Sequence, residues 1–320
     1  MRERPREGTI LIALGGNAIL RCSDRGTAKE QFNNIRESCK HILEIIKLGY
    51  RVVITHGNGP QVGNLLIQHE NAKEIVPPQP LDILVAMTQG QIGYMIQQTL
   101  ENLMRKEGLN IPVITVITQV LVHKNDPNFK NPSKPVGPFY TEEEAKERMR
   151  EGYLIKKVTP KGDRVYRRVV PSPDPVTIVE GEAIKKLVES GVVVIASGGG
   201  GIPVINEDAE LRGIEAVVDK DLAGERLAEI VNADVMLILT DVDKVKLNYG
   251  KPNEKDIDVM TVSEAERYLR EGHFLPGSME PKVRACIRFI RAGGKRAIIA
   301  ALDKAVEALN GKAGTTIIPD

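Results

Sequence analysis

The stretch that decides the fold is Thr9-Ile10-Leu11-Ile12-Ala13-Leu14-Gly15-Gly16-Asn17, near the start of the 320-residue chain. Its first six residues form a short apolar run, which predicts a buried strand that ends at the two glycines. Glycines at such a strand end let backbone N–H groups approach an anion without a Cβ in the way, and a following helix N-terminus adds a favourable dipole. Taken alone, the stretch indicates a tight turn that is either structural or phosphate-binding.

The residues that follow extend this strand into a repeating pattern. A capping box at Thr27 and Glu30 predicts the start of a helix, apolar residues at helical spacing continue it, and Gly49 closes it. Arg51–Thr55 predicts the next strand, which ends in His56-Gly57-Asn58-Gly59 ahead of another helix. Alternating strands and helices predict an α/β fold with a mainly parallel sheet and helices on both of its faces.

The same alternation of predicted strands and helices returns in the second half of the chain, after a proline-rich stretch. Strands are predicted at 192–197, 234–239 and 296–301. Between the halves, residues 124–175 hold eight of the nineteen prolines and a predicted hairpin, 154–158 with 164–169, around Thr159-Pro160-Lys161-Gly162. The length alone would allow two domains. We expect a single domain over residues 1–320 with an inserted, protruding lid subdomain at about 124–175.

Composition excludes several classes of function. The formal net charge is +1, which argues against a nucleic-acid or membrane-surface binder. Three scattered cysteines (Cys22, Cys39 and Cys286) predict neither a zinc cluster nor a disulfide framework. The charged leader, Met1 to Gly8, has no apolar signal region, and no apolar run reaches membrane-span length, so we expect a cytoplasmic protein. No function is assigned to the leader.

Three predicted strands end in glycine turns, at Gly15-Gly16-Asn17, Gly57-Asn58-Gly59 and Gly198–Gly201. Ligands of open parallel sheets bind beyond the carboxyl ends of the strands, so three such turns on one edge favour an anion site over three unrelated tight turns. The turns match neither the Walker loop nor the dinucleotide fingerprint. A phosphoryl-transfer site is the remaining interpretation.

Such a site needs fixed positive charge where the transferred group lies, and three lysines are candidates. Lys220 would lie in the first turn of a helix, where a cation opposes the helix dipole, and this favours function. Lys282 follows the loop Gly277–Pro281 and could equally be a solvated helix residue. Lys134 lies on the lid between prolines, where a surface lysine is the default interpretation. Asp241 and Asp243 lack the spacing of a calcium loop and fit a nucleotide-facing loop better.

Longer motifs resemble the carbamate kinases. They include Thr55–Gly63 (THGNGPQVG), Ala86–Tyr94 (AMTQGQIGY), Ser133–Tyr140 (SKPVGPFY), Val218–Asp221 (VDKD) and Gly277–Lys282 (GSMEPK). The resemblance runs in unbroken order from about Thr9 to Ile318. The sheet-edge glycines are shared with the wider amino-acid-kinase superfamily, whereas the His56 turn, the Ser133–Tyr140 stretch and the Gly277–Lys282 motif select carbamate kinase.

The resemblance implies a fold, a reaction and a set of site residues. The fold would be a three-layer αβα sandwich with a mainly parallel central sheet of about eight strands and a small lid. The reaction would be reversible phosphoryl transfer between ATP and carbamate, giving ADP and carbamoyl phosphate, with Mg²⁺ and in a homodimer. ATP synthesis in catabolism, such as arginine metabolism, is the expected direction.

The residue roles that the resemblance implies fall into three groups, and no protein metal ligand is among them. Lys134, Lys220 and Lys282 would clamp the transferred group, with Asp219 orienting them. The substrate and phosphate region would be lined by Gly15, Gly16, Asn17, Gly57, Asn58, Gly59, Gly199 and Gly200. The nucleotide would lie along Thr240, Asp241, Val242, Tyr249 and Met279.

Two alternatives remain open from the sequence. A sister kinase acting on another carboxylate, such as N-acetylglutamate kinase, would share the sheet-edge glycines but not the narrower motifs. A non-enzymatic nucleotide- or metabolite-sensing protein on the same fold would not need three lysines and Asp219, because it has no transition state to stabilise.

Overall fold

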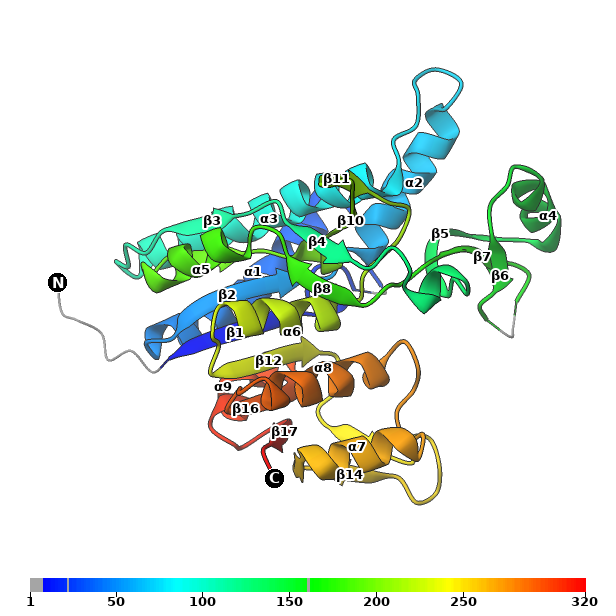
Figure 1. Ribbon diagram of the computed structural model, residues 1–320. Coiled ribbons are helices and arrows are strands. Elements are labelled where there is room, and N and C mark those ends of the chain that lie inside the picture. The colour runs from blue at the N-terminus through cyan, green and yellow to red at the C-terminus, as the bar shows by residue number, and fades with distance from the viewer. Residues whose placement is uncertain (1–7, 22, 160–161) are drawn as a thin grey trace.

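The centre of the computed structural model, which describes residues 8–21, 23–159 and 162–320, is an eight-stranded sheet (Figure 1). The strand order is β15-β17-β16-β12-β1-β2-β9-β3, and every neighbouring pair is parallel except β16 with β17. The strands are β1 (Thr9–Leu14), β2 (Arg51–His56), β3 (Val113–Thr115), β9 (Val193–Ile195), β12 (Val235–Thr240), β15 (Val259–Thr261), β16 (Arg296–Ala301) and β17 (Thr315–Ile318). The mainly parallel sheet of about eight strands is confirmed.

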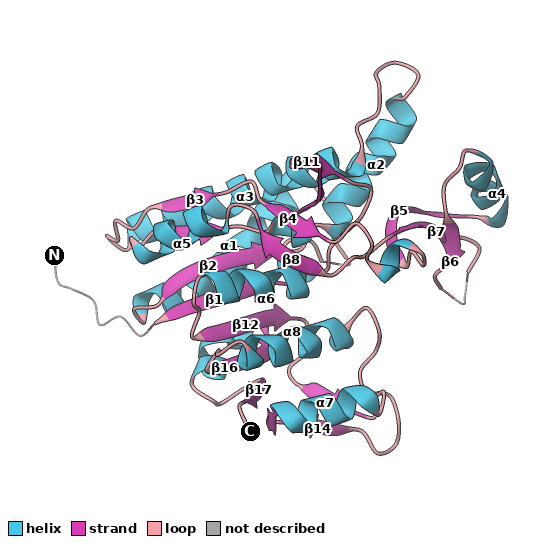
Figure 2. Cartoon of the chain, in the orientation of Figure 1, coloured by secondary structure: helices cyan, strands magenta, loops and turns pink. Residues whose placement is uncertain are grey.

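Helices cover both faces of this sheet because its strands are apolar on both sides (Figure 2). In β1, Leu11 and Ala13 belong to one core and Ile10, Ile12 and Leu14 to the other. The first core is completed by α5 (Gly181–Glu189), α6 (Lys220–Ile230), α7 (Val262–Arg270) and α8 (Met279–Arg291). The second is completed by α1 (Ala28–Lys47), α3 (Leu81–Lys106) and α9 (Ala305–Leu309). The three-layer sandwich is therefore as expected.

Local signals in the sequence match the observed helix ends. The Thr27 side chain accepts a hydrogen bond from the Glu30 amide, and the Glu30 carboxylate accepts one from the Thr27 amide, which completes the predicted capping box of α1. Gly49 follows the helix with a φ of 97°, a left-handed value that favours glycine. The predicted strand at 51–55 continues one residue further, to His56.

Smaller elements surround the main sheet. A second sheet has the order β11-β10-β4-β8, and β13 pairs with β14 in a hairpin. These strands are β4 (Gln119–Val122), β8 (Pro175–Ile178), β10 (Ile202–Glu207), β11 (Glu210–Gly213), β13 (Val245–Leu247) and β14 (Lys255–Ile257). The remaining helices are α2 (Gly59–Ala72) and the 3-10 turns η1 (Gly16–Ala18), η2 (Pro127–Phe129), η3 (Gly198–Gly200) and η4 (Leu302–Lys304).

The proline-rich stretch between β4 and β8 contains a separate three-stranded sheet, β5-β7-β6, with one helix, and we call residues 124–175 the lid segment. It stands at the side of the molecule in Figure 1. Its elements are β5 (Lys134–Tyr140), α4 (Glu142–Arg150), β6 (Ile155–Lys157) and β7 (Tyr166–Val170). The predicted hairpin corresponds to β6 and β7, which pair antiparallel. Its expected turn includes Pro160 and Lys161, which, like residues 1–7 and Cys22, lie outside the described residues.

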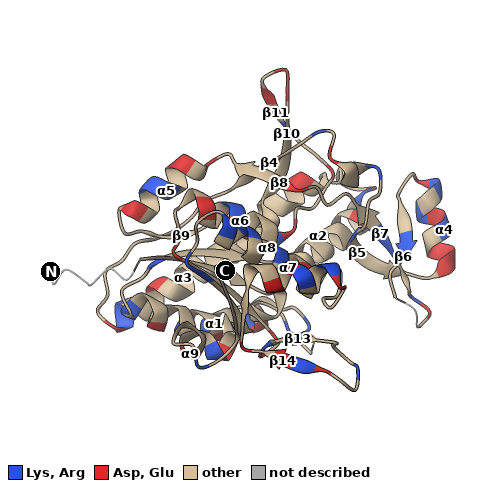
Figure 3. Ribbon diagram, turned by 60° about the horizontal axis from the view of Figure 1, so that its bottom comes forward, with Lys and Arg blue, Asp and Glu red and all other residues tan. Residues whose placement is uncertain are grey.

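Basic residues (blue) and acidic residues (red) are interspersed along the chain (Figure 3). Acidic and basic residues alternate along α4 and along α5 in this view. This distribution matches the near-zero net charge, and any strong positive field must therefore be local.

Candidate functional site

Three glycine turns lie at one edge of the central sheet, because they follow β1, β2 and β9, which are neighbours. The Gly15 amide donates to the Leu239 carbonyl at 2.9 Å, and the Gly57 amide donates to the Leu14 carbonyl at 3.1 Å. A Cβ added to Gly57 would lie 3.5 Å from the Gly16 amide nitrogen. The structure thus brings the first two predicted turns into contact.

The third turn, η3, needs glycine because its neighbours approach the backbone closely. Gly199 and Gly200 have φ values of 68° and 91°. A Cβ on Gly199 would lie 2.2 Å from Asn58 Nδ2, and one on Gly200 would lie 2.1 Å from the Val218 carbonyl oxygen. Ser197, just before the turn, is also left-handed, with a φ of 54°. Such conformations persist only where the surroundings hold them.

Two buried side chains in the middle of α3 provide that support. Thr88 Oγ1 accepts a hydrogen bond from Asn58 Nδ2 at 2.9 Å. Gln89 Nε2 donates to the carbonyls of Gly198 and Thr118, both at 3.1 Å, and Gln89 Oε1 accepts from the Thr118 amide at 2.8 Å. Buried, directional hydrogen bonds of this kind favour one geometry of the turn. The sequence identified Thr88 and Gln89 only as part of a motif and gave them no role.

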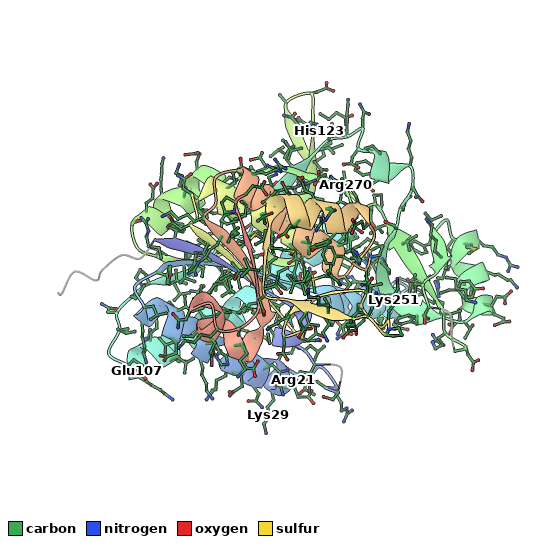
Figure 4. The ribbon with its side chains drawn as sticks, turned by 90° about the horizontal axis from the view of Figure 1, so that it is seen from below. Arg21, Lys29, Glu107, His123, Lys251 and Arg270 are labelled. Atoms are coloured by element: carbon green, nitrogen blue, oxygen red, sulfur yellow. The ribbon has the colours of Figure 1, made fainter. Side chains whose placement is uncertain are left out.

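His56 is the one histidine that the sequence placed beside a glycine turn, and it is buried. Burial, with a smaller contribution from the nearby charge of Lys220, lowers its pKa to about 4. The ring is therefore neutral near pH 7, and its Nδ1 donates to the Gly57 carbonyl at 3.0 Å. By contrast, His123 lies exposed at the edge of the molecule in Figure 4, as its context predicted.

The three predicted lysines converge on two carboxylates at the start of α6. Lys134 Nζ lies 2.9 Å from Asp219 Oδ2. Lys220 and Lys282 both pair with Asp221, at 2.5 and 2.9 Å. From the sequence, we expected Asp219 to orient all three lysines. In the structure, Asp219 Oδ2 accepts a hydrogen bond from Lys134 Nζ. Asp219 Oδ1 accepts a hydrogen bond from the Asp221 amide, which makes Asp219 the N-cap of α6. Asp221, which the sequence left without a role, holds the other two.

The Asp221 carboxylate is buried, and its ionisation explains how two lysines share it. Burial would raise its pKa, but the adjacent ammonium groups of Lys220 and Lys282 outweigh burial and lower it to about 2. Burial lowers the pKa of Lys220, whereas Asp221 raises the pKa of Lys282 in spite of burial. The cluster therefore carries an acid that is ionised at neutral pH and pairs with both lysines.

Two cavities meet at these lysines. The first, of about 540 Å³, lies between the glycine turns and the lid segment, and we call it the lid-side cavity. The second, of about 1010 Å³, extends along the ends of β1, β12 and β16, and we call it the sheet-edge cavity. Both are lined by Gly16, Lys220, Gly277, Ser278 and Lys282. A group held by Lys220 and Lys282 is thus accessible from both sides.

The expected site residues divide between the two cavities. The lid-side cavity is lined by Gly57, Asn58, Gly59, Lys134, Gly199 and Asp219, and the sheet-edge cavity by Gly15, Asn17, Thr240 and Asp241. Asn17 Nδ2 donates to Asp241 Oδ2 at 3.0 Å. Gly200, Val242, Tyr249 and Met279 are not in the lining of either cavity. Tyr249 lies in the turn between β13 and β14 and is 60% exposed.

Neither a metal cluster nor a membrane span marks this chain within the part that the structure describes. No group of three or more His, Cys, Asp or Glu side chains there is placed to hold a metal ion. No described helix is long and apolar enough to cross a membrane.

Comparison with known proteins matches these features. Residues 8–301 match the amino acid kinase family. The carbamate kinase of Pyrococcus furiosus is 57% identical over 313 residues, covering 97% of this chain and 99% of that protein. The carbamate kinase of Clostridium perfringens is 48% identical over 314 residues, with 97% and 99% coverage.

Solved structures agree with the sequence relatives. A carbamate kinase from Giardia lamblia bound to AMP-PNP superposes with a TM-score of 0.92 at 45% identity, covering 98% of this chain and 99% of that one. An N-acetylglutamate synthase from Neisseria gonorrhoeae, at 13% identity and a TM-score of 0.55, shares the fold alone. This chain belongs to the amino acid kinase family and, within it, to the carbamate kinases.

Proposed function

We propose that this chain catalyses reversible phosphoryl transfer between ATP and carbamate, giving ADP and carbamoyl phosphate. The observation that carries the proposal is the meeting of two cavities at Lys220 and Lys282. A phosphoryl group passing between two bound molecules needs such a junction, with donor and acceptor on opposite sides of the transferred group.

The reaction requires the protein mainly to align the two substrates and to neutralise charge on the transferred group. Carbamate is already an anionic nucleophile, so no general base is required, and His56 is buried and neutral. Lys220 and Lys282 would neutralise the charge on the transferred group, and Lys134 would reach it from the lid segment. Asp221 would hold Lys220 and Lys282 in place through its ion pairs.

Backbone amides of the glycine turns would supply further donors. The amides of Gly15 and Gly57 already donate to sheet carbonyls. The anion would therefore be bound by the amides that follow them, at Gly16 and Asn58, which line the lid-side cavity. Gly199 would keep Asn58 in position by its close approach.

The nucleotide would occupy the sheet-edge cavity along Thr240 and Asp241, with Val242, Tyr249 and Met279 completing its surroundings beyond the lining residues. Mg²⁺ bound there would neutralise charge on the phosphates. It commonly takes most of its ligands from nucleotide phosphates and water, which fits the lack of an acidic cluster among the described residues. Asp241, which lines this cavity, is the carboxylate that would hold it.

A coupled assay tests the proposal. The full chain is mixed with carbamoyl phosphate, ADP and Mg²⁺, and ATP formation is followed; a parallel reaction offers ATP with N-acetylglutamate. We expect rapid ATP formation in the first reaction and none of the product acyl phosphate in the second. Activity with N-acetylglutamate alone would show that N-acetylglutamate, and not carbamate, is the substrate. Nucleotide binding without turnover in either reaction would favour the sensing alternative.

We also propose a cytoplasmic homodimer that runs toward ATP synthesis. Support for the dimer comes from α3, where Ile83, Met87 and Tyr94 are exposed by 42%, 44% and 55% on the side away from the glycine turns. Large apolar side chains grouped on one helix face are typical of an interface. Sedimentation of the parent chain beside Met87→Glu tests this: a dimer that the charge dissociates supports the proposal, and a monomeric parent contradicts it.

A further inference from the structure

Strand β7 runs between two cavities, and its adjacent arginines face opposite sides. Arg167 lines the lid-side cavity, whereas Arg168 lines a separate cavity of about 520 Å³ between the lid segment and α2. Arg168 forms an ion pair with Glu215 and lies over the ring of Tyr153. The two neighbours therefore share a strand and a residue type but differ in what compensates their charge.

Arg167 is the uncompensated cation of the lid-side cavity. Four cationic side chains line that cavity, and three of them, the predicted lysines, pair with its two aspartates. Among the described residues, Arg167 forms no ion pair with a carboxylate. Four cations against two carboxylates leave two positive charges, which matches the charge of a phosphate dianion.

The contacts that Arg167 does make hold it in place without neutralising it. Its Nε and Nη2 donate to the Gly137 carbonyl at 3.1 and 2.6 Å, and its guanidinium carbon lies 4.9 Å from the centre of the Phe139 ring. Burial lowers the pKa of Arg167, but a guanidinium stays charged at every physiological pH. A partly buried charge without a counter-ion is costly unless a ligand provides one.

The place of Arg167 differs from that of the catalytic lysines. Gly137, to which it is bonded, lies three residues beyond Lys134 in β5, with a φ of 70° at the point where the pairing of β5 with β7 is interrupted. A Cβ on Gly137 would lie 3.6 Å from Leu66 of α2, so this is the end of the cavity formed by the lid segment and α2. Arg167 therefore enters the cavity from the lid segment, on a different element from Lys220 of α6 and Lys282 of α8.

We propose that Arg167 is an anion-binding residue at the lid end of the cavity, where it captures the phosphate of incoming carbamoyl phosphate before the molecule reaches the lysines. The inference rests on the proposed function, since it names a second binding position for the same substrate. The fork of the guanidinium suits a tetrahedral oxyanion, and its place on the lid segment couples capture to the part of the chain that carries Lys134.

Steady-state kinetics of Arg167→Met and Arg167→Lys test the proposal in the full chain, with carbamoyl phosphate and ADP varied in turn. Methionine keeps the apolar contact with Phe139 and removes the charge, and lysine restores the charge without the fork. We expect Arg167→Met to raise the KM for carbamoyl phosphate about tenfold, equivalent to about 1.4 kcal/mol, with kcat and the KM for ADP within about twofold of the parent. Arg167→Lys should recover most of the loss.

The matched control is Arg164→Met, because Arg164 lies on the same segment but pairs with Glu144 outside the cavity. It should leave both KM values unchanged. We further expect kcat/KM of Arg167→Met for carbamoyl phosphate to depend less steeply on ionic strength than that of the parent, since capture is electrostatic. Melting temperatures of all variants are measured alongside.

Three results would overturn the proposal. An unchanged KM for carbamoyl phosphate would remove the capture role, and a large loss of kcat at constant KM would place Arg167 with the transferred phosphoryl group. A lowered melting temperature with no rescue by lysine would make the residue structural. Failure of the proposed function itself is distinct, because the parent chain would then form no ATP.

Discussion

The floor of the site and its lid segment are built by opposite means. The floor, formed by the glycine turns, is held by buried and directional hydrogen bonds from Gln89 and Thr88, and its third turn, Gly198–Gly201, leaves no room for added side chains. The lid segment touches the body through a small apolar cluster that includes Val136 and Val170, and through partly exposed ion pairs such as Arg148 with Glu70. Ion pairs that keep contact with water contribute little, so we expect the floor to be rigid and the lid segment to be adjustable.

The most severe expected effect comes from the junction of the two cavities. Lys220→Ala removes one of the two cations on Asp221 and should lower turnover about 10²- to 10³-fold, while Lys282 still pairs with the carboxylate and preserves the fold. Coupled ATP formation and thermal unfolding measure the two effects. Near-normal ATP formation from carbamoyl phosphate and ADP by a folded variant would contradict the assignment of Lys220.

The next largest effect is expected at the buried hydrogen bonds that support the glycine turns of the floor. Gln89→Leu leaves the Thr118 amide and the Gly198 carbonyl without their buried partner, and we expect a loss of about 2–5 kcal/mol in the free energy of unfolding. Turnover should fall as well, because the turn carrying Gly199 is no longer fixed. Gln98→Leu is the control, since Gln98 is exposed on the same helix and bonds only Tyr94. Equal effects of both variants would refute the rigid-floor interpretation.

A smaller effect concerns pH. Burial raises the pKa of Glu225 in α6 to about 7, and neither carboxylate oxygen has a hydrogen-bond partner among the described residues, although Arg226 Nε lies 3.5 Å away. Because the folded-state pKa lies above the ordinary value of 4.5, stability present at low pH is lost as pH rises toward 7. Glu225→Gln should match the parent at pH 5 and exceed it by up to about 3 kcal/mol at pH 8.

Urea unfolding of both proteins at the two pH values measures this difference. Arg288, Asp174 and Glu229 also influence Glu225, so the control is Glu229→Gln, which removes a neighbouring charge on the surface. A parent whose stability does not change between pH 5 and pH 8 would show that Glu225 is solvated or paired in solution.

The mildest effect is expected at the lid. Glu70→Gln breaks the pair with Arg148, which keeps Glu151 as a partner, and should change the free energy of unfolding by less than about 1 kcal/mol and kcat by less than about twofold. Unfolding and ATP formation are measured at low and at high salt, where the parent and the variant should converge. A loss as large as that of Gln89→Leu would show that the lid segment is as firmly fixed as the floor.

The contrast between floor and lid also explains what the sequence could reveal. The strand–helix rhythm, the capping box at Thr27 and the three glycine turns are local patterns, and the fold they predict is confirmed. Lys220 could be singled out because a cation in the first turn of a helix opposes the dipole. Asp221 could not, because an acid in the same turn already has an ordinary explanation.

The roles of other residues could not be predicted from the sequence, because their partners are distant along the chain or because the side of the strand that they face is set by the tertiary structure. Gln89 meets Gly198 across 109 residues of sequence, and within its helix it follows the same pattern as any buried residue. Arg167 and Arg168 form a simple basic pair in a strand, and only the tertiary structure decides which cavity each one lines. The roles carried over from the resemblance stay predictions for every site residue, including Val242, Tyr249 and Met279, which line neither cavity.

The sharing of Asp221 by two lysines has a consequence for turnover. With the cavities empty, Lys220 and Lys282 are already engaged by a carboxylate that remains ionised to low pH. An arriving phosphate must compete with this resident anion, so part of the attraction between the lysines and any ligand is cancelled in advance. Asp221 also competes for the two lysines when the product leaves, because its carboxylate can pair with them again. A pair of lysines with its own counter-ion therefore binds a phosphate less tightly than two free lysines would, and it releases the phosphate faster.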